Sequence, residues 1–185
     1  MACNHTIHKN SHHFGWDKSI NPILSISPGQ TVEIETIDSS GGQLSPNSTV
    51  EDLLSLSFDK VNPVTGPVFI EGAKPSDAVA ITFLDFKPSG WGWTANIPGF
   101  GLLADQFLDP NLHIWEYDSI SQNPALYGPG GSVPLKPFVG TIGLALNEPG
   151  NHSVVPPRRV GGNLDIRDNS VGTTLYLPVE VEGGL

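Results

Sequence analysis

Glycine and proline recur along the whole chain, and their abundance constrains the fold more than any other feature. The 185 residues include 21 glycines and 17 prolines, well above the usual share of these two residues. They alternate with short apolar runs and follow no fixed period, which excludes a collagen-like repeat and disfavours disorder. Short strands joined by frequent turns fit this pattern. The sequence therefore predicts a mostly β fold with a β-sandwich or barrel-like architecture and short helices.

Several segments have the composition of strands. Residues 31–38 alternate apolar and acidic side chains, as in a half-buried strand. Residues 77–86 are apolar on both faces, which predicts a buried central strand. Residues 173–181 alternate again, but Pro178 interrupts the backbone donors and predicts a sheet edge or a bulge. Two shorter candidates are residues 21–27 and 67–71.

Helical signals are few. A capping box from Ser48 to Glu51 precedes apolar residues at helical spacing, which predicts one or two helical turns there. Residues 101–107 are a second candidate for a short helix. The length of the chain fits one domain of residues 1–185, or two small β subdomains within it.

Charge and cysteine content limit the partners and the compartment. The formal net charge of −10 would repel phosphate backbones and anionic lipid surfaces, so neither nucleic acid nor membrane is expected as a partner. No apolar run reaches the roughly 20 residues that span a bilayer. The N-terminus lacks the apolar stretch of a secretory signal, and the single cysteine, Cys3, has no partner for an internal disulfide. A cytoplasmic location is expected.

Two segments near the N-terminus carry side chains suited to chemistry. In residues 12–17, two histidines precede Trp16, and neutral imidazole can bind a metal or act as a general base. Adjacent strand residues point to opposite faces, so at most one histidine would face a site, and a solvated pair is the more frequent outcome. In residues 37–43, Asp38 and Gln43 could bind a metal and a substrate amide. From composition alone, an ordinary turn is favoured there.

Two further segments lie later in the chain. Residues 88–101 place Trp91 and Trp93 among glycines, either as an aromatic wall around a small pocket that contacts substrate or as core aromatics between turns. In residues 156–167, two glycines precede Asn163 and Asp165. Glycine permits unusual backbone angles that could aim both side chains into one space, where a carboxylate could bind metal or carry protons.

Taken in order, these segments resemble the acetamidase/formamidase family, and the resemblance covers roughly residues 11–185. Each motif is short, but their common order along the chain makes the resemblance specific. The motifs that carry it are His13–Asp17, Ile26–Gly29, Glu35–Asp38, Gly41–Leu44, Val61–Pro67, Glu71–Ala73, Gly90–Trp93, Pro98–Leu103, Gly140–Gly143 and Pro156–Arg167.

The resemblance implies an enzyme that hydrolyses short amides, such as formamide or acetamide, to a carboxylate and ammonia. It also implies a divalent metal, zinc in several members, that activates the attacking water. By matching position, His13 and Asp38 are the candidate metal ligands, and Asn163 and Asp165 are the candidate catalytic residues. All four are expected around one cavity.

The sequence departs from the family pattern at its end. Family members continue past the Leu-Pro-Val strand into a Gly-Asp-x-His segment and a Gly-Asp-Gly-Glu segment, whereas this sequence ends at Leu185. We therefore expect residues outside this chain to complete the site, in a homo-oligomer or in a second chain that supplies the C-terminal half. The alternative is a catalytically inactive fragment or assembly module. A cupredoxin-like electron carrier is excluded, because the only cysteine and methionine are Cys3 and Met1.

Overall fold

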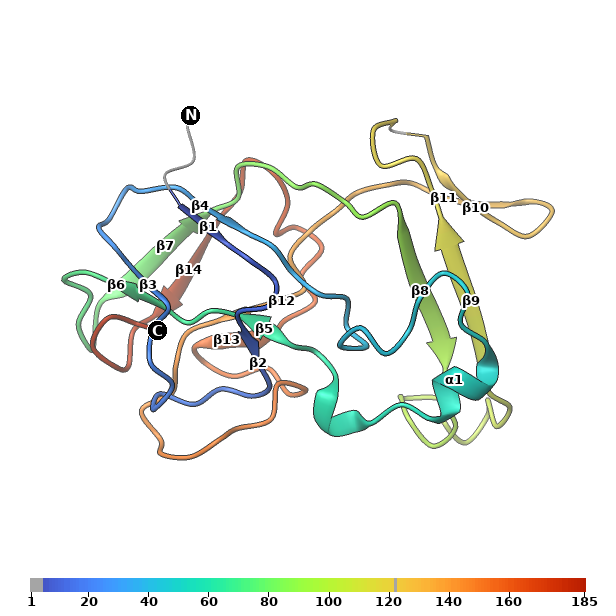
Figure 1. Cartoon of the computed structure of the whole chain (residues 1–185), viewed down its shortest axis with the longest axis horizontal. Helices are drawn as coiled ribbons and strands as arrows, with labels where there is room; N and C mark the ends of the chain where they lie inside the picture. Colours follow the sequence, from blue (N-terminus) through green and yellow to red (C-terminus); the bar gives the residue numbers. More distant parts are fainter. Residues whose placement is uncertain (1–4, 122) are drawn as a thin grey trace.

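The computed structural model describes residues 5–121 and 123–185, so Met1 and Cys3 lie outside the described residues. Most regular structure is β, as predicted (Figure 1). The described elements, in chain order, are β1 (His5–Ile7), β2 (His12–His13), β3 (Leu24–Ile26), β4 (Val32–Ile34), α1 (Val50–Leu54), the 3₁₀ helix η1 (Phe58–Lys60), β5 (Val64–Thr65), β6 (Val68–Ile70), β7 (Ala78–Thr82), β8 (Trp91–Asn96), β9 (Asn111–Glu116), β10 (Ala125–Tyr127), β11 (Gly131–Val133), β12 (Thr141–Gly143), β13 (Gly161–Asn163) and β14 (Thr174–Pro178).

The strands of the described residues pair two by two and do not close into a barrel, so the barrel-like expectation is wrong. Two pairs, β1–β4 and β3–β6, are parallel. The pairs β2–β5, β7–β14, β8–β9, β10–β11 and β12–β13 are antiparallel. The strands are short because glycines with positive φ and prolines interrupt them, and short strands cannot extend a ladder far enough to close it.

In Figure 1, the pair β8–β9 lies at one end of the molecule and β7–β14 near the other. The pairs β2–β5 and β12–β13 lie between them, so the first and fourth segments with predicted chemistry lie near the middle of the fold, whereas the third, which contains β8, lies at one end.

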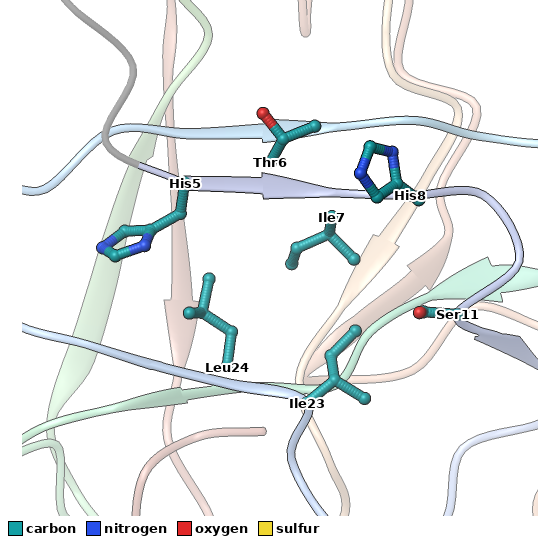
Figure 2. Close-up of a pocket in the computed structure, with 7 residues that line it drawn as sticks. All are labelled: His5, Thr6, Ile7, His8, Ser11, Ile23 and Leu24. Atoms are coloured by element: carbon teal, nitrogen blue, oxygen red, sulfur yellow. The ribbon is translucent and has the colours of Figure 1, made fainter.

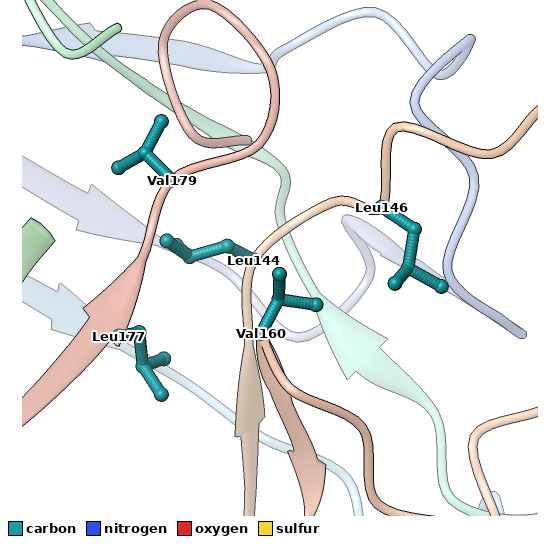
Figure 3. Packing of buried hydrophobic residues seen from close by; sticks show 5 residues of the cluster. All are labelled: Leu144, Leu146, Val160, Leu177 and Val179. Atoms are coloured by element: carbon teal, nitrogen blue, oxygen red, sulfur yellow. The ribbon is translucent and has the colours of Figure 1, made fainter. Parts of the chain in front are cut away.

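The main apolar core forms around the end of β14. Its five buried side chains come from β14 itself and from the residues that directly follow β12, precede β13 and follow β14 (Figure 3). They are Leu144, Leu146, Val160, Leu177 and Val179. The predicted alternation of the last strand is confirmed, since Leu177 is buried and Tyr176 is exposed. The strand ends at Pro178 and pairs with β7 alone among the described strands, as expected for an edge.

The prediction that residues 77–86 form a strand buried on both faces is wrong. Val79 and Ile81 of β7 pack against the core cluster, whereas Ala80 and Leu84 are exposed. The cause is the two-stranded sheet, because the described residues cover only the face of β7 that Val79 and Ile81 share.

The helix is present, but its cap lies one residue later than predicted. Thr49 is the N-cap, and its backbone N–H donates to Asp52 Oδ2 at 2.8 Å in a capping box. Ser48 instead accepts a hydrogen bond from the backbone of Ser45. Residues 101–107 form turns and not a helix, since Gly101 has a φ of +105°. No helix within the described part of the chain is long and apolar enough to cross a membrane.

Candidate functional site

The segment after β2 is held tightly against the loop that contains Asn151. Gly15 is buried with a φ of +105°, and a Cβ there would lie 1.8 Å from Asn151 Oδ1. Asn151 Nδ2 donates to the carbonyl of Phe14 at 3.1 Å, and Trp16 forms a backbone bridge with His152. Only glycine fits at position 15, because both its backbone angle and its neighbour exclude a side chain.

His13 lies on β2, opposite Val64 of β5, and is half-buried. Its Nδ1 lies 2.8 Å from the carbonyl oxygen of Gly15. A carbonyl can only accept, so Nδ1 carries the proton and Nε2 keeps its lone pair. Burial lowers the pKa of His13, more than the nearby Gly15 carbonyl raises it. The side chain is therefore a neutral imidazole of the kind that binds a metal or accepts a proton.

Asp38 makes its contacts within a turn and with one tryptophan. Its Oδ1 accepts hydrogen bonds from the backbone and hydroxyl of Ser40 and from Trp93 Nε1, the last at 3.1 Å. Its Oδ2 accepts from the backbone of Gly42 at 3.1 Å. The second and third predicted segments therefore meet, but through a carboxylate that already accepts four hydrogen bonds.

Gln43 fastens the same loop to the segment before η1. Its Nε2 donates to the carbonyls of Ser40 at 2.7 Å and Ser57 at 3.2 Å, and its Oε1 accepts from the Ser57 backbone at 2.8 Å. Trp91 is half-buried on β8, opposite Glu116 of β9. The hydrogen bonds of Gln43 with Ser40 and Ser57 are enough to explain the position of its side-chain amide, and no ligand is needed.

The two predicted catalytic residues have different surroundings. Asn163 is half-buried on β13, where its Oδ1 accepts from Thr141 Oγ1 at 2.9 Å and its Nδ2 donates to the Val155 carbonyl at 3.1 Å. Asp165 is exposed with a φ of +50°, and its backbone N–H donates to the Gly140 carbonyl. Asn163 therefore holds the loop before β13, and Asp165 faces solvent.

Trp16 brings the first and fourth segments together. It is 8 % exposed and packs with Val64 and Val154. A Cβ added to Gly143 would lie 3.1 Å from the indole ring, and one added to Gly162 would lie 3.7 Å from its Nε1. The indole thus lies against the β12–β13 pair. Composition did not single out Trp16 as a site residue, although it lies within the predicted segment 12–17.

A cavity of about 210 Å³ lies beside this junction. Its walls come from the segment after β2, from η1 and the residue after it, and from the loop before β13. They are Phe14, Gly15, Phe58, Asp59, Val61, Asn151, Ser153, Val154 and Val155. The volume suits a molecule of a few heavy atoms better than a drug-sized ligand. None of the seven predicted site residues lines it, but Gly15 and Val155 are direct hydrogen-bond partners of His13 and Asn163.

A second cavity of about 400 Å³ lies between β1 and the start of β3 (Figure 2). Ile7, Ile23 and Leu24 point into the space between the two strands, with His5 and His8 on the β1 side. His8 pairs with Glu35 at 3.3 Å. No predicted site residue lines this cavity.

The fit of a metal can be judged from the available ligands. Zinc sites in enzymes use three protein ligands, and structural sites use four. No group of three or more His, Cys, Asp or Glu side chains among the described residues is placed to hold one metal ion. His13 fits as one ligand through Nε2. Hydrogen bonds from Ser19 chiefly lower the pKa of Asp17, with smaller effects from His152 and His13, so these three groups are within electrostatic reach.

Sequence comparison relates the chain to one known family. The model of the Acetamidase/Formamidase family matches residues 2–151. The formamidase of Methylophilus methylotrophus is 26 % identical over 93 % of this chain and 55 % of its own length. The acetamidase of Mycolicibacterium smegmatis is 27 % identical over 94 % of this chain and 57 % of its own length. The chain thus spans somewhat more than half the length of these curated relatives.

Comparison of structures agrees. The crystal structure of an acetamidase from Bacillus halodurans is 36 % identical, with a TM-score of 0.87 over 97 % of this chain and 59 % of that one. A gamma lactamase from Delftia acidovorans, 23 % identical with a TM-score of 0.86 over 97 % of this chain and 59 % of that one, shares the fold. Because the family model covers most of the sequence and the fold agrees, this chain belongs to the acetamidase/formamidase family.

Proposed function

We propose that this chain forms part of a hydrolase that converts short linear amides into a carboxylate and ammonia. One observation carries the proposal: nearly the whole chain superposes on an acetamidase at 36 % identity with a TM-score of 0.87. The curated relatives named formamidase and acetamidase support the same substrate class. The cavity of about 210 Å³ beside Trp16 has a size that suits such a substrate.

His13 is the residue of this chain best prepared to act on water. Its Nδ1 is committed to the Gly15 carbonyl, and its lowered pKa keeps the ring neutral near pH 7. Nε2 can therefore accept a proton from water or bind a metal. A divalent metal, zinc by preference, would polarise the amide carbonyl and lower the pKa of its bound water to about 7. Asn163 would position the cavity wall through Val155, and Asp165 would carry protons from its exposed position.

We propose further that residues outside this chain complete the site, in a second chain or another copy of the same one. Two observations support this. The described residues hold no three-ligand group, and the chain spans somewhat more than half the length of its curated relatives. We propose a cytoplasmic location for the assembled enzyme. An inactive assembly module is the second candidate function. Asp38 and Gln43 favour it, because the polar side-chain atoms of both residues form hydrogen bonds within the protein.

Ammonia release tests the proposal directly. The chain would be assayed on formamide and acetamide, alone and mixed with the part of the Bacillus halodurans acetamidase that lies outside the match, with zinc content measured in each sample. We expect the mixture to release ammonia. Absence of ammonia from every zinc-loaded mixture would refute the enzymatic proposal, and a stable but silent complex would favour the assembly module.

A matched pair of variants then isolates His13. His13→Gln should lower the rate by roughly 100-fold or more, as expected for loss of a general base or metal ligand. The control is His12→Gln on the same strand, where Nδ1 contacts the Lys9 carbonyl at 2.7 Å. The control should stay within about threefold of the parent rate. Equal effects of the two substitutions would remove His13 from the proposed machinery.

A further inference from the structure

The loop between β8 and β9 exposes many large apolar side chains. It spans residues 97–110 and joins the two strands at their end near α1 (Figure 1). Five large apolar residues of this loop are each more than half exposed, and Leu102 is fully exposed. They are Phe100, Leu102, Leu103, Phe107 and Leu108. Nowhere else among residues 5–121 and 123–185 do five such residues lie exposed within nine positions.

Hydrogen bonds hold this loop in a defined shape. Asn96 Nδ2 donates to the carbonyls of Phe107 at 3.1 Å and Asp109 at 2.6 Å, which closes the loop at its base. The backbone N–H groups of Gln106 and Phe107 both donate to the Leu103 carbonyl, at 2.9 Å and 3.1 Å. A surface that is already ordered loses less conformational entropy when it binds a partner. The loop therefore suits a docking surface.

The exposed apolar surface reaches the cavity assigned to the substrate. The rings of Phe100 and Phe58 lie 5.6 Å apart between their centroids. Phe58 is 48 % exposed and also lines the cavity of about 210 Å³. Phe58 thus connects the loop to the rim of the cavity, and a partner that covers the loop also reaches this rim.

The missing ligands and the charge of the chain indicate what kind of partner fits. A large exposed apolar patch on a soluble protein marks an interaction surface. The described residues hold no group of three side chains for a metal, and the chain spans 55 % and 57 % of the length of its formamidase and acetamidase relatives. A second copy fits less well, because each copy carries a net charge of −10 and Asp105 lies in the loop itself.

We propose that the 97–110 loop, together with Phe58, is the docking surface for a second polypeptide that corresponds to the part of these relatives outside the match. We call that polypeptide the complementing part. It covers the five apolar side chains with an apolar face of its own and supplies metal ligands at the cavity rim beside Phe58. This inference rests on the proposed function, and it narrows the partner from another copy of this chain to a different chain.

The test is co-expression of the full 185-residue chain with a tagged complementing part from the Bacillus halodurans acetamidase, followed by recovery of the chain through the tag. Leu102→Asp places a charge in the centre of the proposed surface and should lower recovery at least about 10-fold. The control is Ile120→Asp, because Ile120 is 93 % exposed and follows β9 at the opposite end of the β8–β9 pair. The control should stay within about twofold of the parent. Equal recovery of the two variants, or no recovery of the parent chain, would overturn the inference.

Hydrogen exchange locates the surface independently of any variant. Backbone amides of residues 57–61 and 97–110 should exchange at least about 5-fold more slowly in the complex than in the free chain. Residues 125–133, which form β10, β11 and their connection, should exchange equally in both states. Protection confined to residues 125–133 would overturn the inference. So would a dimer of the chain alone that Leu102→Asp dissociates, as measured by light scattering, because the occupant would then be a second copy.

Binding and catalysis can fail separately. A complex that depends on Leu102 but releases no ammonia from formamide would refute the proposed function while the docking surface remained. Ammonia release from a complex that Leu102→Asp leaves intact would refute the docking surface while the proposed function remained.

Discussion

The indole Nε1 of Trp93 donates a 3.1 Å hydrogen bond to Oδ1 of Asp38, which joins β8 to the loop after β4. Asp38 also accepts from the backbone of Ser40 and Gly42, so one carboxylate shapes the turn and anchors it to a distant strand. Two residues singled out for chemistry are thus direct partners, and their contact joins the turn to the strand.

Asp38→Ala should destabilise the protein strongly. The variant leaves the half-buried Trp93 N–H and the turn donors without their acceptor, and we expect a loss of about 2–3 kcal/mol in the free energy of unfolding. Urea unfolding measures it. The control is Asp105→Ala, at an exposed position in the turns after β8, which should change stability by less than about 0.5 kcal/mol. A loss confined to metal content, with unchanged stability, would show that Asp38 is a ligand and not an anchor.

Gln43→Ala separates a substrate contact from a structural bridge. The amide spans Ser40 and Ser57 through three hydrogen bonds, so we expect a loss of about 1–3 kcal/mol in unfolding free energy. Exposed Gln106 provides the matched control. In a reconstituted active mixture, KM for formamide should stay within about twofold of the parent where Gln43→Ala remains folded. A raised KM at unchanged stability would instead place Gln43 against the substrate.

Local patterns predicted the elements whose environment is local. The alternation of residues 173–181 depends on one covered face, and β14 shows it. The prediction that residues 77–86 are buried on both faces was wrong, because apolar side chains on both faces of a strand do not reveal which face the described fold covers. The cap of α1 moved by one residue because Ser48 and Thr49 are both good caps, and the reciprocal contact with Asp52 selects Thr49.

The site was predictable as a set of segments and not as a set of contacts. Trp16 and Gly162 come together from the first and fourth segments. His13, Asp38, Asn163 and Asp165 were expected around one cavity, and none of them lines either of the two cavities described above. Composition does not say where a polar side chain finds its partners, and Asp38 and Asn163 find theirs in backbone and neighbouring side chains. Trp16 Nε1 has no acceptor within the part of the chain that the structure describes, and this depends on three-dimensional packing that no local pattern encodes.

Glu180 should make the stability of the protein sensitive to acid. Its side chain is 14 % exposed, and the hydrogen bonds from Arg159 chiefly, then from the Asn147 backbone, lower the pKa of Glu180. The unfolded chain therefore takes up this proton at a higher pH than the folded one. The stabilisation is present above the ordinary glutamate pKa of about 4.3 and is lost as pH falls through the lowered folded value.

The matching experiment compares Glu180→Gln with the parent by urea unfolding between pH 3 and pH 7. At pH 7 the free energy of unfolding of Glu180→Gln should be lower than that of the parent, and this gap in stability should narrow below about pH 4. Glu182→Gln, at an exposed position two residues later, serves as the control and should show no such gap. A gap that stays constant across this range would mean that the charge of Glu180 does not contribute.

The last prediction concerns the contact between Gly15 and Asn151 that closes one wall of the cavity. Gly15→Ala introduces a Cβ 1.8 Å from Asn151 Oδ1 at a backbone φ of +105°. It therefore combines a clash with backbone strain, and we expect a loss of more than about 2 kcal/mol in unfolding free energy. Gly29→Ala isolates the strain, because Gly29 has a φ of +88° and no atom within 4 Å of an added Cβ.

The difference in unfolding free energy between Gly15→Ala and Gly29→Ala measures the cost of the clash. The double variant Gly15→Ala with Asn151→Ala tests whether Asn151 is its source. Removing the Asn151 side chain eliminates the clashing oxygen but also the 3.1 Å hydrogen bond to the Phe14 carbonyl. We therefore expect a favourable coupling of about 1 kcal/mol or more between the two substitutions in a double-mutant cycle. If Gly15→Ala and Gly29→Ala cost the same, and the cycle shows no coupling, then Asn151 does not pack on Gly15 and the cavity wall is placed differently.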